Sequence, residues 1–217
     1  PNFTNTISAI TTTVKQEPPK ETKLSIVINK NLPKYTINLT NSSAAAAAHI
    51  NIFRGSELKI PLQVITLDPN IFVRMTDNLP FASEDVNFDG YIDIGVLVDG
   101  GVKWGAFQYW IFDKNTGLFT STTYTQELKG IGYNKIKFDT KNKRIITSNF
   151  FGAVAGGAVS IFQYDNGHLK LIEDNLADNI AVEPTKQDSV INCQITIKKY
   201  DGNKDSVMTK TLPHECP

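Results

Sequence analysis

The sequence contains few of the residues that most enzymes use for catalysis. Among its 217 residues are three histidines and two cysteines. No Gly-x-Ser-x-Gly elbow, His-Glu-x-x-His pair or glycine-rich phosphate loop occurs in the chain. Cys193 and Cys216 lack the Cys-x-x-Cys spacing that many zinc sites show. We therefore expect that the protein is not an enzyme.

Neither a charge excess nor a long apolar run is present. Lys and Arg together number 22, as do Asp and Glu, so the formal net charge at pH 7 is zero. This balance gives no electrostatic reason to expect nucleic acid or an anionic membrane surface as a partner. No apolar stretch reaches the roughly 18 residues of a membrane-spanning helix. The sequence therefore predicts neither a nucleic-acid-binding protein nor a membrane span.

Helical periodicity is almost absent as well. The five alanines Ala44–Ala48 favour a helix but are too few for a stable one. Residues 1–22 are rich in Thr, Asn, Pro and Lys, which is typical of a flexible leader. Short apolar or alternating segments then follow one another, as in strands, and Leu118–Thr123 is one of them. We expect a leader over 1–22 and a single all-β domain over 23–217.

A weak repeat in the second half indicates how the strands are connected. An apolar segment ends in an aromatic residue and an aspartate, and a short turn rich in Asn, Gly and Lys follows. The pairs are Phe112-Asp113, Phe138-Asp139, Tyr164-Asp165 and Tyr200-Asp201. Asn and Gly tolerate the positive φ angles of hairpin turns. Successive hairpins at this interval predict an antiparallel meander, either β-propeller-like or a pair of twisted sheets.

One loop has a spacing of oxygen-bearing residues that predicts a metal site. Residues 85–93 read Asp-Val-Asn-Phe-Asp-Gly-Tyr-Ile-Asp, and Gly90 permits a sharp turn. The oxygen donors stand at alternate positions, and they are Asp85, Asn87, Asp89, the Tyr91 carbonyl and Asp93. Ca²⁺ takes roughly six to eight oxygen ligands, and alternate residues of a tight loop can direct them to one point. We therefore expect Ca²⁺ as a cofactor, and a solvated acidic turn is the alternative.

The loop differs from an EF-hand after its glycine. An EF-hand requires a bidentate glutamate at its twelfth position and a helix on each side. The corresponding residue here is Val96, within the β-branched segment Ile92–Val98, which predicts a strand. A calcium loop that leads into a strand resembles the FG-GAP or VCBS-type loops of integrin-like β-propeller blades. This resemblance implies a structural role for the ion.

The two cysteines admit two interpretations. An even number of cysteines near the end of the chain fits one disulfide, Cys193–Cys216, that closes the final hairpin. Two buried thiols are the alternative. A disulfide, together with a calcium loop suited to millimolar free calcium, favours a periplasmic or secreted protein.

The segment Asn149–Ala158 has two adjacent aromatic residues followed by small ones. Aromatic side chains are favoured anchors in protein interfaces, and glycines permit close backbone approach. The segment is therefore a candidate partner-binding loop, and a core strand with a glycine bulge is the alternative. The candidate contact residues are Phe150, Phe151, Gly152, Gly156 and Gly157.

The stretch from about Leu62 to Glu173 resembles a family of bacterial secreted proteins that inhibit peptidoglycan hydrolases. This family includes immunity proteins paired with lysozyme-like effectors of secretion systems. The residues that carry the resemblance are Glu84–Asp93, the hairpin Phe112–Phe119 and the hairpin Tyr164–Leu169.

The resemblance implies a β-propeller-like fold with one bound Ca²⁺ and a periplasmic location, with a lipid anchor in some members. It also implies that the protein binds and blocks a bacterial cell-wall hydrolase. Related inhibitors present a Ser-Gly-containing loop to the enzyme, whereas this chain has Phe151-Gly152 in its candidate loop.

A second interpretation is an integrin-like β-blade module of a surface protein, which would bind another protein or a glycan. Such a module usually belongs to a chain with several copies of the calcium loop. This sequence has one copy. The single copy favours the inhibitor over the surface module.

Overall fold

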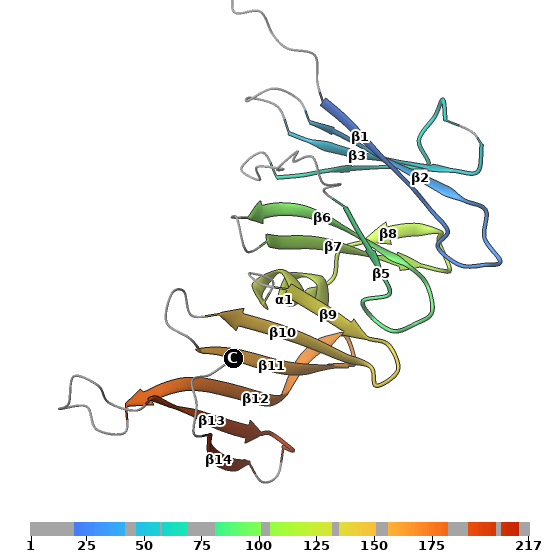
Figure 1. The fold of residues 1–217 in the computed structure, drawn as a ribbon. Helices are drawn as coiled ribbons and strands as arrows, with labels where there is room; N and C mark the ends of the chain where they lie inside the picture. The colour runs from blue at the N-terminus through green and yellow to red at the C-terminus, as the bar shows by residue number, and fades with distance from the viewer. Residues whose placement is uncertain are drawn as a thin grey trace, which may run out of the picture.

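The computed structural model consists almost entirely of antiparallel strands (Figure 1). Within the residues it describes, no helix is long and apolar enough to cross a membrane. The described residues are 20–41, 47–56, 58–68, 81–100, 105–131, 135–150, 156–181, 191–202 and 205–212.

The strands form three open sheets, and in each sheet the strand order follows the chain order. Sheet 1 contains β1 (Lys20–Ile26), β2 (Tyr35–Asn41), β3 (His49–Arg54) and β4 (Gln63–Thr66). Sheet 2 contains β5 (Phe81–Glu84), β6 (Asp93–Gly100), β7 (Gly105–Asp113) and β8 (Leu118–Thr120). Sheet 3 contains β9 (Lys135–Asp139), β10 (Arg144–Phe150), β11 (Gly156–Asp165), β12 (His168–Ala181), β13 (Ile191–Lys199) and β14 (Ser206–Leu212). The expected all-β antiparallel meander is confirmed. It consists of three sheets, whereas one of the two predicted arrangements was a pair of twisted sheets.

Sheet 2 is the middle layer of the molecule (Figure 1). On β7, Trp110 and Phe112 face sheet 1 and join Tyr35 of β2 in one buried cluster. Tyr109, the residue directly before Trp110, belongs to a second cluster with Tyr124 of the helix. Successive side chains of a strand point to opposite faces. Strand β7 is therefore buried on both sides, which explains its nearly continuous apolar sequence.

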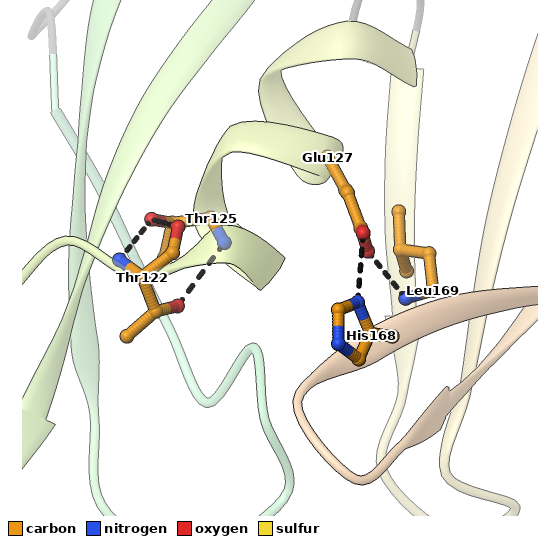
Figure 2. Close-up of polar contacts among 5 residues, drawn as sticks. All are labelled: Thr122, Thr125, Glu127, His168 and Leu169. Carbon is orange, nitrogen blue, oxygen red and sulfur yellow. Dashed lines mark hydrogen bonds and ion pairs between the residues drawn. The ribbon is translucent and has the colours of Figure 1, made fainter.

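One helix, α1 (Thr123–Ile131), lies between sheets 2 and 3, where the sequence led us to expect a strand that reached Thr123. Strand β8 ends at Thr120. The helix begins with two reciprocal hydrogen bonds, shown in Figure 2. The Thr122 N–H donates to the Thr125 hydroxyl at 2.8 Å, and the Thr125 N–H donates to the Thr122 hydroxyl at 3.3 Å. This is the geometry of a capping box with Thr in place of the usual Glu or Gln.

The aromatic-aspartate pairs lie where the repeat predicted, at strand ends. Three of them end β7, β9 and β11, and Tyr200-Asp201 follows β13 directly. In two of the turns the aspartate accepts a hydrogen bond from a backbone N–H of the turn. Asp113 accepts from Asn115 at 2.9 Å, and Asp139 accepts from Asn142 at 3.2 Å. These short-range bonds stabilise the turns and explain why Asp recurs there.

The proposed leader lies mostly outside the described residues. Strand β1 begins at Lys20 and pairs with β2 along its whole length, so residues 20–22 are part of sheet 1. Of the alanine tract, Ala47 and Ala48 are described. Neither is helical, and Ala48 is buried just before β3.

Candidate metal loop

The predicted calcium loop connects β5 to β6, and its side chains bind the backbone of the loop itself. The Asp85 carboxylate accepts from the N–H groups of Asp89 and Gly90 at 3.0 and 2.9 Å. The Asn87 carbonyl oxygen accepts from the Asp89 N–H at 3.2 Å. The Asp89 carboxylate accepts from the Tyr91 N–H at 2.9 Å and from the Asn87 amide at 3.0 Å. Every one of these bonds spans at most five residues, so the spacing of oxygens in the sequence fixes the local shape.

Two backbone positions of the loop have positive φ angles. Gly90 has φ of 87°, as expected for the glycine at the sharp turn. Phe88 has φ of 60°, which is uncommon for a residue with a bulky side chain. Its ring packs against Phe138 of β9 with the centroids 6.5 Å apart. This packing helps to hold Phe88 in a conformation that an isolated peptide would avoid.

Asp93 is the one ligand candidate that is completely buried. Its two carboxylate oxygens accept hydrogen bonds from the N–H groups of Val86 and Phe112, at 2.9 and 2.8 Å. Burial raises the pKa of Asp93 to about 7, with smaller contributions from the charges of Asp89 and Asp85, while the two N–H bonds oppose the rise. Burial also raises the pKa of Asp85. A cation near these carboxylates would favour their charged forms.

The donor set fits a hard cation in composition. Asp85, Asn87, Asp89 and the Tyr91 carbonyl lie on one exposed or half-buried turn, and Asp93 lies at its base. Each carboxylate oxygen has two lone pairs, so one N–H bond leaves it a lone pair for a metal ion. Among the described residues, however, no three Asp, Glu, His or Cys side chains converge on one metal position. Calcium binding therefore stays a prediction, which requires these carboxylates to turn toward a shared ion.

The loop also connects the layers of the molecule. Toward sheet 1, the Asn29 side chain donates to the Gly90 carbonyl at 3.1 Å, and the Ile92 N–H donates to the Ile28 carbonyl at 2.9 Å. Toward α1, the Val86 carbonyl accepts a hydrogen bond from the Tyr124 hydroxyl.

Ring contacts extend the same connection to sheets 2 and 3. The Tyr91 ring stacks on Phe112 of β7 with centroids 5.6 Å apart, and Phe88 contacts Phe138 of sheet 3. An order–disorder change in this loop would therefore alter contacts with all three sheets.

Part of the candidate partner-binding segment lies in strands. Phe150 ends β10 and stands opposite Gly157 of β11, so Gly156 and Gly157 lie in a strand rather than in a loop. Phe151 and Gly152 lie outside the described residues. Partner binding by this segment therefore stays a prediction.

The structure describes one of the two cysteines of the predicted disulfide. Cys193 lies in β13, opposite Leu212 of β14, and is fully buried. Cys216 lies outside the described residues, so the Cys193–Cys216 pairing stays a prediction.

The sequence did not indicate the polar contact between α1 and sheet 3. The Glu127 carboxylate on α1 accepts from the Leu169 N–H at 2.6 Å and lies 2.9 Å from the His168 Nδ1 (Figure 2). The His168 hydrogen bond is the main reason why the pKa of Glu127 is lowered, and the Leu169 N–H adds to it. Glu127 and His168 are 41 residues apart in the chain, so no local sequence motif predicts the contact. It holds the helix against the β11–β12 hairpin.

Comparison with known proteins shows the fold. No protein-family model matches the sequence, and no curated protein matches it. Among solved structures, the chain is similar to a protein described as a Xanthomonas type IV secretion system related protein. The match has a TM-score of 0.54 and 12% sequence identity, and it covers 88% of this chain and 100% of that chain. At this identity the likeness supports a shared fold, and the functional resemblance depends on the motifs given above.

Proposed function

We propose that the protein is a calcium-stabilised immunity or inhibitor protein that binds and blocks a secreted peptidoglycan hydrolase of the lysozyme type. The proposal places it in the periplasm or outside the cell, as a binding protein rather than an enzyme. The observation that carries the proposal is the loop Asp85–Asp93, whose residues resemble a motif of the inhibitor family and whose contacts extend toward all three sheets.

The similar Xanthomonas structure is a second support for an immunity protein. The structural match covers the whole of the Xanthomonas chain, and that protein is described as related to a type IV secretion system. A link to a secretion system is compatible with an immunity protein, since such a protein protects a cell against a secreted effector.

The calcium part of the proposal can be tested without knowing the target. A ligand that binds only the folded state stabilises it by about 2.7 kcal/mol at a hundredfold excess over Kd. We expect the melting temperature of the protein to fall when a chelator removes calcium and to recover when calcium is added back. Asp89→Ala should abolish this difference because it removes one donor and its carboxylate charge.

Asp113→Ala is the matched control for Asp89→Ala. Asp113 also lies in an exposed turn and also accepts a backbone N–H, but it lies outside the loop. This variant should melt at a lower temperature and still respond to calcium. An identical melting curve with calcium and with chelator would show that the loop binds no calcium.

The inhibition itself is tested by mixing. Purified protein is added at equimolar concentration to lysozyme-type hydrolases, including any encoded beside its gene, and the clearing of a peptidoglycan suspension is followed. We expect at least one enzyme to lose activity. Phe151→Ala should weaken the inhibition, whereas Ile60→Ala should not, since Ile60 is an exposed apolar residue between β3 and β4. Unchanged clearing with every enzyme, together with binding on a glycan array, would favour the surface module instead.

A further inference from the structure

Strand β14 is the outer strand of sheet 3, and it is exposed on both faces. Val207 and Met208 point to opposite faces, and each is 65% exposed. Among the described elements, β14 makes substantial contact only with β13. Neither buried cluster includes a residue of β13 or β14. Strand β14 thus has exposed side chains on both faces, and no described strand pairs with its outer edge.

Most other sheet edges in the described residues are protected against strand pairing. Strand β9 carries Lys135 and Lys137, and β4 and β5 are only four residues long. The backbone of Phe119 in β8 is capped by the Gln63 side chain, which donates to its carbonyl at 2.7 Å and accepts from its N–H at 2.9 Å. Charges, short strands and covered edges are the usual means by which proteins prevent edge-to-edge association. Strand β14 has seven residues, no proline and one charge, Lys210.

We infer that β14 pairs in antiparallel orientation with β14 of a second copy of this chain, around a twofold axis at Thr209. Ser206 and Leu212 are equally far from Thr209 in the sequence, so this register pairs the whole strand. Val207 then stands opposite Thr211 of the second copy, and Met208 stands opposite Lys210. Residues that face each other lie on the same face of the sheet, as antiparallel pairing requires.

The charges of the strand favour this register. Lys210 meets an uncharged thioether, and its aliphatic stem can pack on Met208. A register centred on Lys210 would place two lysines directly opposite each other, which destabilises a sheet. The lysines of β13 stand opposite Ser206 and Val207, at one end of the strand and away from the axis.

Strand β13 also favours the register centred on Thr209. Thr196 of β13 stands opposite Thr209 of β14, so the proposed axis creates a row of four threonines, two from each copy. Cross-strand threonine pairs stabilise antiparallel sheets. The two six-stranded sheets would become one continuous sheet.

The size of the contact sets the strength of the association. A single seven-residue edge buries less surface than the roughly 1,200 Å² at the lower end of stable interfaces. We therefore expect a reversible dimer that forms at high micromolar protein concentrations. This inference is independent of the proposed inhibition and of calcium.

Sedimentation velocity over a range of protein concentrations tests the dimer, with the full chain in calcium-containing buffer. Thr209→Lys places two like charges opposite each other at the axis, and it should raise the dimer Kd roughly tenfold or more. Thr209→Glu should do the same. An equimolar mixture of the two variants should associate again at low salt, because opposite charges then meet. Ser25→Lys, an exposed position on the edge strand β1, is the matched control and should leave the dimer unchanged.

A second variant tests the register by strengthening it. Met208→Glu places a carboxylate opposite Lys210 at both symmetric positions and should lower the dimer Kd several-fold. A protein that stays monomeric up to millimolar concentration would overturn the inference. A dimer Kd that Thr209→Lys leaves unchanged would also overturn it. So would an equimolar mixture of Thr209→Lys and Thr209→Glu that fails to associate.

Discussion

At the scale of single residues, Gly95 shows how closely sheet 2 is packed. A Cβ atom added to Gly95 of β6 would lie 2.7 Å from the ring of Tyr109 and 3.2 Å from the Cβ of Ala82. Tyr109 is buried, so its ring has no open space into which to move. We expect Gly95→Ala to lower the free energy of unfolding by about 1–3 kcal/mol, as overpacking does.

Urea unfolding measures this effect, with Gly130→Ala as the control. Gly130 lies in α1, and no atom lies within 4 Å of the position of an added Cβ. Alanine there should stabilise the protein by up to about 1 kcal/mol, because glycine is the poorer helix former. Equal effects of the two substitutions would contradict the packing argument.

Asp93 predicts a pH dependence that calcium should remove. Without calcium its pKa is raised from 3.8 to about 7, so the folded state retains a proton that the unfolded state loses. Its contribution to stability is therefore complete below pH 4 and is lost as the pH rises through 7. We expect the unfolding free energy in chelator to fall over this range, and to fall less in calcium.

Asp93→Asn is the control for this pH dependence. The variant cannot ionise at position 93, so its stability in chelator should vary less between pH 4 and pH 7. Its stability at low pH should be lower than that of the unchanged protein, because the side chain has only one oxygen for the two N–H groups of Val86 and Phe112. The same slope in both proteins would assign the pH dependence to another group.

The loop illustrates what residue patterns can and cannot predict. The spacing of Asp85, Asn87, Asp89 and Gly90 predicts a tight turn, because their hydrogen bonds are local. The burial of Asp93 could not be predicted, since the bond that it accepts from Phe112 spans 19 residues. A buried position depends on which strand lies next to it, and the sequence gives no direct signal for that.

At the scale of elements, α1 depends on its unusual N-terminal cap. Thr122→Ala removes the hydroxyl that accepts the Thr125 N–H, and it should lower the free energy of unfolding by about 1 kcal/mol. Thr123→Ala, one position later, should change stability little, and alanine favours a helix there. Urea unfolding followed by circular dichroism compares the two variants. If Thr123→Ala is the more destabilising substitution, the cap is not the start of the helix.

Strands and turns were predictable, whereas the helix was not. The turn residues Asp113 and Asp139 act through neighbours two or three positions away, so their pattern is visible in the sequence. The helix is short, and its capping box lacks the glutamate or glutamine that marks such boxes. The one available signal was the four-residue spacing of Tyr124 and Leu128, both fully buried, which places them on one face of a helix.

At the scale of the whole molecule, the sequence does not mark where one sheet ends and the next begins. The apolar sequence of β7 was the useful sign, because a strand with both faces buried must lie between two layers. The two buried clusters lie on the two sides of this middle sheet, and neither includes a residue of β13 or β14.

This arrangement predicts an uneven response to calcium across the molecule. The Ile92 N–H donates to the Ile28 carbonyl, between β1 and β2, and the Phe112 N–H donates to Asp93, so both amides depend on the order of the loop. Among the described strands, β14 pairs with β13, at the edge of sheet 3 opposite the β9 edge that the loop contacts. Hydrogen exchange in chelator should therefore become faster at Ile92 and Phe112 and stay unchanged in β14.

The same exchange measurement on Asp89→Ala separates a local effect from global unfolding. In this variant Ile92 and Phe112 should exchange quickly both with and without calcium, because the loop cannot gather the ion. If chelator accelerates exchange in β14 as much as at Ile92, calcium stabilises the fold only as a whole. The loop would then have no special role at the junction of the sheets, and its contacts with Ile28, Tyr124 and Phe138 would be ordinary packing.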